Sequence, residues 1–504
     1  MSKFNTKTTQ RGASPIKVSP GVVSTYEGAT ARALDEKSEL FSLAVTNMVG
    51  QDTFYEDRDT RDSRYVTLID IVTTVDPKWV ADMLVWLRTE ANMRSAALVG
   101  AAEYVRARGP NGRAVVRSVL QRADEPGELL AYWTNKHGRK IPQPIKRGIA
   151  DAIAGGLYNE YSIQKYDSAA RGFRFADVIQ LTHPKPKDST QEQLLKYALD
   201  RRYQGSEAVP GEGLSMLQAS DRLDAYLKAG VTADSVSAEQ LREAGWTWER
   251  LSSYGAFTKE TWEAIIPTMG YMALLRNLRN FEQAGVSQTV MEKVQARLSD
   301  PEQVARSRQL PYRFYSAYRE VSSDRTKVAL GEALRHSFKN IDLPGRNLVL
   351  IDVSGSMQSS WSQSKVIPAD VASIMGVAVA SGQDADVVAF ATYSKQLDIR
   401  PGGSPLDQAS RIPGLGRELG YGTNISGAIR KHYNGHDRVL VFTDMQSHDN
   451  GGVSVPTYVF DLAGYGRVPE LGTNTVIFTG WNDVFVRMIP LIEEGRQGNW
   501  PWVR

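Results

Sequence analysis

The sequence contains no cysteine. This absence excludes disulfide bonds, zinc ribbons and thiol chemistry, and it favours a compartment in which thiols stay reduced, so we expect a cytoplasmic protein. The sequence also lacks any apolar run near the roughly 20 residues that a membrane helix needs. Residues 1–20 are polar and contain no apolar signal segment. We therefore expect neither export nor a membrane span.

The sequence also lacks a large excess of positive or negative charge. It contains 60 Lys and Arg and 57 Asp and Glu, which leaves a net charge of +3. Only local clusters of charge can therefore indicate a nucleic-acid partner. The apolar content of 41% and the charged content of 23% are those of an ordinary globular protein. At 504 residues the chain is too long for one core, so at least two domains are expected.

From about residue 30 to 340 the pattern is helical, with apolar residues three and four positions apart and short Gly, Pro, Asp or Ser breaks between them. Residues 269–285, for example, are predicted to form one helix that ends at Gly285. The apolar residues of this helix share one face and are Tyr271, Leu274, Leu275, Leu278 and Phe281. Helix pairs of about 40 residues would suit a HEAT-like solenoid. An irregular helical domain is the alternative.

After Pro344 and Gly345 the pattern changes to short β-branched runs that alternate with helix-like segments such as 365–380 and 481–494. The runs are NLVLID, DVVAFA, RVLVFT, PTYVFD and NTVIFT. Nearly continuous apolar strands are typical of a parallel sheet covered on both faces. We therefore predict three regions: an N-terminal extension that is flexible in part (1–30), a helical-repeat domain (31–344) and a doubly wound α/β domain (345–504).

Oxygen-bearing side chains follow two predicted strands of the α/β domain, at the edge where such sheets bind ligands, and one more lies in a Gly-rich loop before a predicted helix. They are Asp352, Ser354, Ser356, Thr423 and Asp444. Carboxylates and hydroxyls without imidazole or thiolate favour a hard cation, and Mg²⁺ in particular. The alternative is that the two serines only shape a turn and cap a helix, but this leaves Thr423 and Asp444 unexplained.

The pattern D-x-S-x-S with a distant Thr and Asp resembles the metal-ion-dependent adhesion site of von Willebrand factor A domains. The resemblance implies that the serines and the threonine contact the metal, that the aspartates often act through water, and that a partner's carboxylate completes the shell. One departure is the loop Gly-Tyr-Gly-Thr, where Gly-Gly-Thr is expected, so Tyr421 is predicted to alter access to the metal.

The sequence motifs of several common enzyme classes are missing. There is no G-x-x-x-x-G-K-[ST] and no G-x-S-x-G, and Ser354 stands where a haloacid-dehalogenase phosphatase has its second Asp. His432 and His436 have a metal-ligand spacing, but Asn434 and Gly435 break the helix between them and no third ligand accompanies them. We expect two solvated loop histidines and no catalytic activity.

Between Trp133 and Lys187, ten Lys and Arg face four Asp and Glu, a local balance of +6 with aromatic residues interspersed. Such a stretch suits phosphate backbones and unstacked bases, although a solvated helix face is the plainer interpretation. Four segments of the sequence resemble a known family, and they are FADVIQLTHPKP, ALLRNL, WLRTEANMRSAALVGAAEYV and HGRKIPQPIKRGIADAI. The family that they resemble is the TROVE-domain family, which includes the Ro ribonucleoprotein autoantigen and bacterial relatives. The resemblance extends over residues 30–500.

The family resemblance implies a ring of HEAT-like repeats closed by the von Willebrand factor A domain. Small noncoding Y RNAs bind its basic outer surface, and single-stranded ends of misfolded RNAs pass through its hole. By position, the RNA-binding residues would be Lys165, Arg171, Arg174, His183, Lys185, Arg139, Lys140, Lys146 and Arg147. Candidates for the lining of the hole are Arg88, Arg94, Arg276 and Arg279.

The sequence thus predicts a cytoplasmic, monomeric, non-catalytic ring that binds a Y-like RNA and captures single-stranded 3′ ends for processing or quality control. A ribonuclease or other protein would join it through the RNA or the A domain. The alternative function is a metal-dependent protein-interaction scaffold on an α-solenoid, without RNA.

Overall fold

The computed structural model describes residues 18–25, 30–45, 58–91, 93–167, 172–307, 309, 311–338, 343–359, 366–381, 383–400, 402–465, 467–469, 471, 475–479, 489, 493, 500 and 502. The chain divides into two compact units. The helical unit comprises Thr73–Glu90 and Ala97–Arg297, and the mixed unit comprises Met1–Val72, Ala91–Ala96 and Leu298–Arg504. The domain boundaries drawn above at residues 30 and 344 remain predictions.

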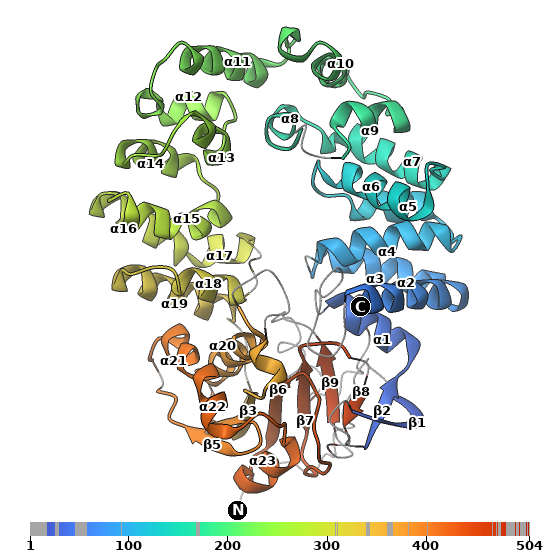
Figure 1. Ribbon diagram of the computed structural model, residues 1–504, viewed down its shortest axis with the longest axis vertical. Helices are drawn as coiled ribbons and strands as arrows, with labels where there is room; N and C mark the ends of the chain where they lie inside the picture. The colour runs from blue at the N-terminus through green and yellow to red at the C-terminus, as the bar shows by residue number, and fades with distance from the viewer. Residues whose placement is uncertain are drawn as a thin grey trace, which may run out of the picture. The chain divides into compact units, whose positions relative to one another are not determined.

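The helical unit consists of short helices that follow one another along the chain (Figure 1). It takes in the end of α2 (Arg58–Val75) and most of α4 (Arg94–Arg106). Its other α-helices are α3 (Pro77–Thr89), α5 (Gly112–Val119), α6 (Glu125–His137), α7 (Gln143–Ala152), α8 (Glu160–Tyr166), α9 (Phe175–Thr182), α10 (Ser189–Tyr203), α11 (Ser215–Lys228), α12 (Ala238–Glu243), α13 (Trp248–Leu251), α14 (Lys259–Ile265), α15 (Tyr271–Gln283) and α16 (Gln288–Leu298). A π-helical turn (Ile153–Leu157) continues α7. Short 3-10 turns lie at Gly205–Glu207, Ala233–Ser235, Ser252–Tyr254 and Ile266–Thr268.

Helix α15 shows how the apolar spacing positions these helices. Leu274, Leu275, Leu278 and Phe281 are buried on one face, as their spacing predicts, and Gly285 follows the helix with a left-handed φ of 69°. Asn277, which the periodicity places on the polar side, is buried as well. Its amide is satisfied because it donates 2.9 Å to the carbonyl of Ala273.

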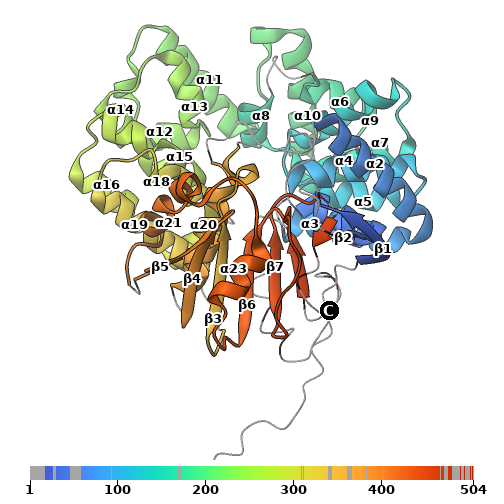
Figure 2. The same ribbon diagram turned by 60° about the horizontal axis from the view of Figure 1, so that its bottom comes forward.

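The mixed unit is built on a six-stranded sheet with the order β5-β4-β3-β6-β7-β9, and Figure 2 shows strands of this sheet side by side. All neighbouring pairs are parallel except β4 and β5. The strands are β3 (Asn347–Asp352), β4 (Ala385–Phe390), β5 (Ser394–Leu397), β6 (Arg438–Thr443), β7 (Thr457–Asp461) and β9 (Thr475–Thr479). Every residue of β3, β6 and β7 is buried, as expected of strands covered on both faces.

Helices α20 (Pro368–Ala380), α21 (Pro405–Arg411), α22 (Gly416–Leu419) and α23 (Ile425–His432) and 3-10 turns at Ser356–Gln358 and Pro413–Leu415 connect the strands. Gly376 allows α20 to lie close to β3, because a Cβ atom at this position would stand 2.7 Å from Ile351. Helix and strand therefore pack directly, and β3 is fixed in the core that supports its carboxyl end.

Segments from both ends of the chain complete the mixed unit. Strands β1 (Val18–Ser24) and β2 (Thr30–Leu34) pair with each other, and β2 pairs with β8 (Arg467–Pro469), all antiparallel. Part of the predicted N-terminal extension is therefore a strand. Helix α1 (Glu36–Val45) and α17 (Pro301–Ser307), α18 (Pro311–Tyr318) and α19 (Asp324–Ser337) belong to the same unit.

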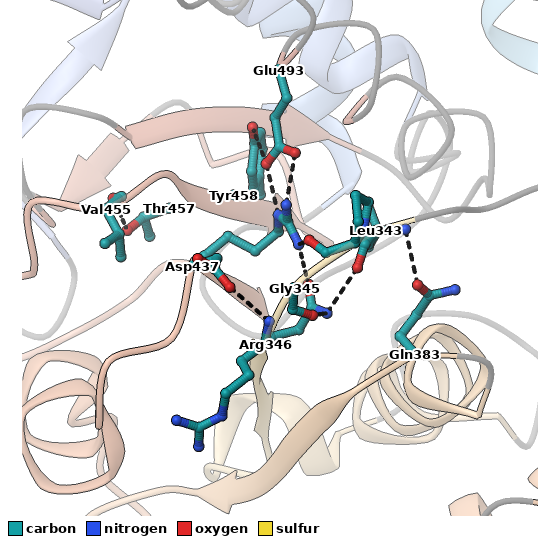
Figure 3. A network of polar contacts seen from close by, with 12 residues as sticks. Leu343, Gly345, Arg346, Gln383, Asp437, Val455, Thr457, Tyr458 and Glu493 are labelled. Atoms are coloured by element: carbon teal, nitrogen blue, oxygen red, sulfur yellow. Dashed lines mark hydrogen bonds and ion pairs between the residues drawn. The ribbon is translucent and has the colours of Figure 1, made fainter. Parts of the chain in front are cut away.

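A polar network holds the amino ends of the central strands (Figure 3). Arg438, which begins β6, donates to both carboxylate oxygens of Glu493 at 2.7 and 2.8 Å, to the carbonyl of Pro344 and to the side chain of Asn347, both at 2.8 Å. The hydroxyl of Tyr458 donates to the same carboxylate at 3.1 Å. This network fixes the edge of the sheet opposite the carboxyl ends.

The predicted fold class, a HEAT-like helical region followed by a doubly wound domain of the von Willebrand factor A type, is confirmed. The five predicted strand runs form β3, β4, β6, β7 and β9, and the segment 365–380 contains α20. The expected helix at 481–494 lies almost wholly outside the described residues. Within the described part of the chain, no helix is long and apolar enough to cross a membrane.

Candidate functional site

The five predicted metal-binding residues lie on neighbouring segments of the mixed unit. Asp352 ends β3, and Ser354 and Ser356 follow it on the next turn. Asp444 comes directly after β6, which pairs with β3, and Thr423 lies in the loop before α23. All five are buried, with exposed fractions of 0 to 3%.

Two hydrogen bonds connect these segments. The hydroxyl of Thr443, the last residue of β6, donates 2.5 Å to Oδ2 of Asp352. The hydroxyl of Ser447 donates 3.2 Å to the carbonyl of Thr423. The carboxyl ends of β3 and β6 and the threonine loop therefore form one arrangement.

The two carboxyl groups of this arrangement are poorly compensated. Burial raises the pKa of Asp352 to about 6, although hydrogen bonds from Ser354 and Thr443 oppose the shift. Burial, followed by the charge of Asp352, raises the pKa of Asp444 well above its ordinary range. Oδ2 of Asp444 is buried and has no hydrogen-bond partner among the described residues.

The donor atoms of this arrangement fit a hard cation. The hydroxyl oxygens of Ser354 and Ser356 lie 3.4 Å apart, and they supplement two carboxylates that lack a positive partner. Across the described residues, no cluster of three or more His, Cys, Asp or Glu could hold a metal. A cation here would therefore depend on hydroxyl oxygens as well as on the two aspartates, which is chemistry that Mg²⁺ accepts.

Tyr421 lies beside the serine turn. Its carbonyl accepts 2.9 Å from the N–H of Gly355, and a Cβ atom at Gly355 would stand 3.4 Å from that of Tyr421. The side chain is 73% exposed. Tyr393, which follows β4 and which sequence reasoning missed, is 70% exposed, and its N–H donates 2.9 Å to Leu419 just before the same loop. Two exposed rings thus accompany this loop.

The predicted RNA-binding residues that the structure describes lie in the loop between α6 and α7, on α7 and α8, and at both ends of α9 and just after it, all within the helical unit. Those with exposed side chains, which we name the α6–α9 cations, are Arg139, Lys140, Arg147, Lys165, His183 and Lys185. Lys146 is half-buried, and Arg171 lies outside the described residues. His183 ends α9 with a left-handed φ of 49° and ψ of 61°. The start of α10 lies against the π-helical turn that continues α7, since Gln191 of α10 donates a hydrogen bond of 2.9 Å to the carbonyl of Ile153. The loop between His183 and α10 is joined to the same side chain, because the N–H of Lys187 donates 2.8 Å to Gln191.

Arg174 is positioned differently from the α6–α9 cations. It precedes α9, and its guanidinium donates 2.8 Å to Oδ2 of Asp167, whose carboxylate also accepts from the N–H of Phe175 at 3.1 Å. Asp167 is buried. The charge of Arg174 is therefore largely neutralised within the protein, which leaves less of it for a phosphate.

The comparisons with known proteins point in one direction. The TROVE-domain model matches residues 240–365. The chain is 27% identical over 290 residues to the RNA-binding protein RO60 of Deinococcus radiodurans, a match that covers 51% of each protein. It is 39% identical over 74 residues to telomerase protein component 1 of Mus musculus, which covers 14% of this chain and 3% of that protein. The crystal structure of the Deinococcus radiodurans Ro (RSR) protein has a TM-score of 0.62 at 19% identity, and the match covers 92% of this chain and 100% of that one.

The chain is similar to a bacterial Ro protein in sequence over about half its length and in fold over most of it. The predicted resemblance is thereby confirmed, although the sequence match to RO60 spans about half the length of that relative. The likeness to the solved Ro structure concerns the fold.

Two expectations for this chain are wrong. Arg88 is not available to line a channel, because its side chain is buried and donates 2.5 Å to the carboxylate of Glu125. His436 is not solvated. It is 2% exposed, and its ring is 2.9 Å from Oδ2 of Asp386, while His432 is half-buried and lies 3.0 Å from the hydroxyl of Ser394.

Proposed function

We propose that this chain is a non-catalytic RNA-binding protein. It binds a small noncoding Y-like RNA through the α6–α9 cations, and it captures single-stranded 3′ ends of misfolded or structured RNA for processing or quality control. The similarity to a protein named for RNA binding supports the general activity. The lack of cysteine supports the cytoplasm as its location.

The observation that carries this proposal is the exposure of the α6–α9 cations. Among the described residues, the side chains of Arg139, Lys140, Arg147 and Lys185 make no hydrogen bond or ion pair, so their charges remain available to a ligand. Lys165 stands 5.5 Å from the ring centres of Tyr161 and Tyr166. Tyr161 is exposed and Tyr166 is half-buried. A cation beside an accessible aromatic ring suits RNA, because the cation can bind phosphates and the ring can stack on unstacked bases.

Capture of a flexible RNA end requires an enclosed path, and we propose that the helical array closes into a ring. The support comes from the mixed unit alone, which contains helices from both ends of the array. Arg61 of α2 donates 2.6 Å to the carbonyl of Ala463, and Tyr315 of α18 donates 3.0 Å to Asp370 of α20. The helices that precede and follow the helical unit in the sequence are therefore bound to the same α/β fold.

We further propose that Asp352, Ser354, Ser356, Thr423 and Asp444 hold Mg²⁺. The ion would neutralise the two buried carboxylates and offer a binding position for an anionic oxygen of a partner protein, such as a ribonuclease. The unpartnered Oδ2 of Asp444 supports this proposal.

Purification at low salt tests the RNA-binding function directly. We expect RNA to copurify, high salt or ribonuclease to remove it, and sequencing to identify it as small structured RNA. The stripped protein should then bind a fluorescein-labelled hairpin RNA with a single-stranded 3′ tail. Failure to retain or bind any RNA would favour the alternative, a metal-dependent protein-interaction scaffold.

A further inference from the structure

Helices α5 and α7 of the helical unit cross at very short range. A Cβ atom at Gly148 of α7 would stand 2.7 Å from the side chain of Val116 and 2.8 Å from the carbonyl of Arg113, both on α5. The starts of the two helices are in ordinary contact, because a Cβ atom at Gly112 would lie 3.5 Å from Pro144. The short distance between the helices therefore depends on Gly148, and the residues beside it have defined positions.

Charged residues stand at helical i, i+4 spacing on each side of this crossing. Arg113 and Arg117 belong to α5, while Arg147 and Asp151 belong to α7. Arg113 binds Asp151 through two hydrogen bonds, from Nε at 2.6 Å and from Nη2 at 2.8 Å. This bidentate pair connects the two helices.

A hollow of about 620 Å³ opens at this pair. It is lined by Asn111, Arg113, Ala114, Arg117, Ser118 and Asp151. The hydrogen bonds and charge of Arg113, followed by the charges of Arg117 and Arg147, lower the pKa of Asp151. Three arginines thus act on one carboxylate, which leaves the neighbourhood of the hollow with an excess positive charge.

Two of these arginines have no partner of their own. Both Arg117 and Arg147 are exposed, and within the described part of the chain neither guanidinium makes a hydrogen bond. A guanidinium presents several donors in a planar fork that matches a phosphate group. Because Arg113 is already occupied by Asp151, the donors open to a ligand are those of Arg117 and Arg147.

We propose that the hollow between α5 and α7 is a binding site for a backbone phosphate of RNA, with two arginines, Arg117 and Arg147, as its ligands. Arg117 lines the hollow, and Arg147 lies outside the lining but near enough for its charge to act on Asp151. The Arg113–Asp151 pair is the positioning element that holds the two helices and keeps the open guanidinium groups apart from the carboxylate. Contacts to a backbone phosphate carry no base-sequence information, so binding at this site should not depend on base sequence. The site rests on the proposed RNA-binding function and adds Arg113, Arg117 and Asp151 to that function.

The test compares four proteins by fluorescence anisotropy, with a labelled hairpin RNA that has a single-stranded 3′ tail, over a series of salt concentrations. Arg117→Gln with Arg147→Gln should weaken binding by roughly 10-fold and reduce the slope of log K against log salt by about 1 to 2. Asp151→Asn should tighten binding about 2- to 5-fold, because it removes a negative charge from the hollow and keeps an acceptor for Arg113. Arg222→Gln removes an exposed arginine from α11 and is the matched control, which should change neither quantity.

The outcomes separate this site from the proposed function. If the double variant binds RNA like the wild type and keeps its melting temperature, the phosphate site is refuted while RNA binding stands. Weaker binding by folded Asp151→Asn would also overturn it. If the wild type itself binds no RNA, the proposed function fails first. A last outcome combines two results: inorganic phosphate at low millimolar concentration displaces the RNA, and the double variant binds RNA with unchanged affinity. Together they would show that a small anion binds elsewhere, and they would contradict the assignment.

Discussion

The hydroxyl group of Thr443 donates a hydrogen bond to the carboxylate of Asp352 on the neighbouring strand, with 2.5 Å between the two oxygens. The bond occupies Oδ2 of Asp352, while Oδ1 accepts 2.8 Å from the N–H of Ser354. The carboxylate is therefore oriented before any ion arrives. Preorganisation of this kind reduces the cost of binding a cation.

Asp352→Ala should abolish Mg²⁺ binding and leave RNA affinity within a few-fold. The proposed ligands all come from the mixed unit, whereas the α6–α9 cations belong to the helical unit. Isothermal titration calorimetry with Mg²⁺ and RNA anisotropy measure the two effects. Asp461→Asn, a change at the buried carboxyl that ends β7, is the matched control and should retain Mg²⁺ binding. A large loss of RNA affinity in folded Asp352→Ala would refute the separation of the two sites.

Joint replacement of Lys165, Arg171 and His183 should weaken RNA binding and reduce the salt slope by about 1 to 2, because two fixed charges and one further donor are lost. Arg174→Gln provides a contrast. Its guanidinium is paired with buried Asp167, so this change should lower the melting temperature and alter the slope little. An unchanged slope in the triple variant would place the RNA on other residues.

A hairpin with a single-stranded 3′ tail should bind much more tightly than the same hairpin cut blunt. The reason is the proposed ring, whose opening would admit one strand and exclude a duplex, with little sequence preference. Annealing a complementary oligonucleotide to the tail should remove the advantage. Competition experiments with the three RNAs decide the point, and equal affinities would refute threading while leaving the α6–α9 cations as a binding surface.

As the pH rises from about 4 to about 6, the free energy of unfolding of the metal-free protein should fall because Asp461 loses its proton. Burial raises the pKa of this carboxyl to about 6, against hydrogen bonds from the N–H groups of Gly464 and Ala463. Between the two pKa values the folded state holds a proton that the unfolded state has released. The contribution of Asp461 to the free energy of unfolding is therefore fully present below the unfolded pKa, and it is lost as the pH rises through 6. Asp461→Asn keeps the acceptor oxygen and should remove this loss, which is on the order of 2 kcal/mol. Urea unfolding in the presence of a chelator, at pH 4 and pH 7, measures the difference. An equal pH dependence in both proteins would contradict the assignment.

The sheet was predictable from sequence because its strands are continuous apolar runs, which few other structures bury. The convergence of Asp352 and Asp444 followed from the rule that parallel strands end at one edge. The pairing of Arg174 with Asp167 was not predictable, since it depends on how the turn before α9 folds back. The burial of His436 was missed because a break between two histidines says nothing about the carboxylate of Asp386 beside it.

The hollow between α5 and α7 shows a further limit. Arg113, Arg117, Arg147 and Asp151 have ordinary helical spacing, and sequence alone does not reveal which helices cross. The informative residue is Gly148, whose missing side chain sets the distance between the helices. Glycine inside a helix is a weak signal, because it indicates a close contact without naming the partner.

The strand pair formed by β2 and β8 has a consequence for synthesis on the ribosome. The helical unit is nearly continuous in sequence, so its helices can pack as they emerge. The mixed unit cannot, because Ser42 meets Thr479 only after 437 further residues. At roughly 5 to 20 residues per second, the first strands and the apolar side of α1 wait about 20 to 90 s for their partners. During that interval β2 has an unpaired edge where β8 will bind, and α1 exposes hydrophobic surface, so nascent chains that stall before Thr479 should be the species that chaperones hold and proteases remove.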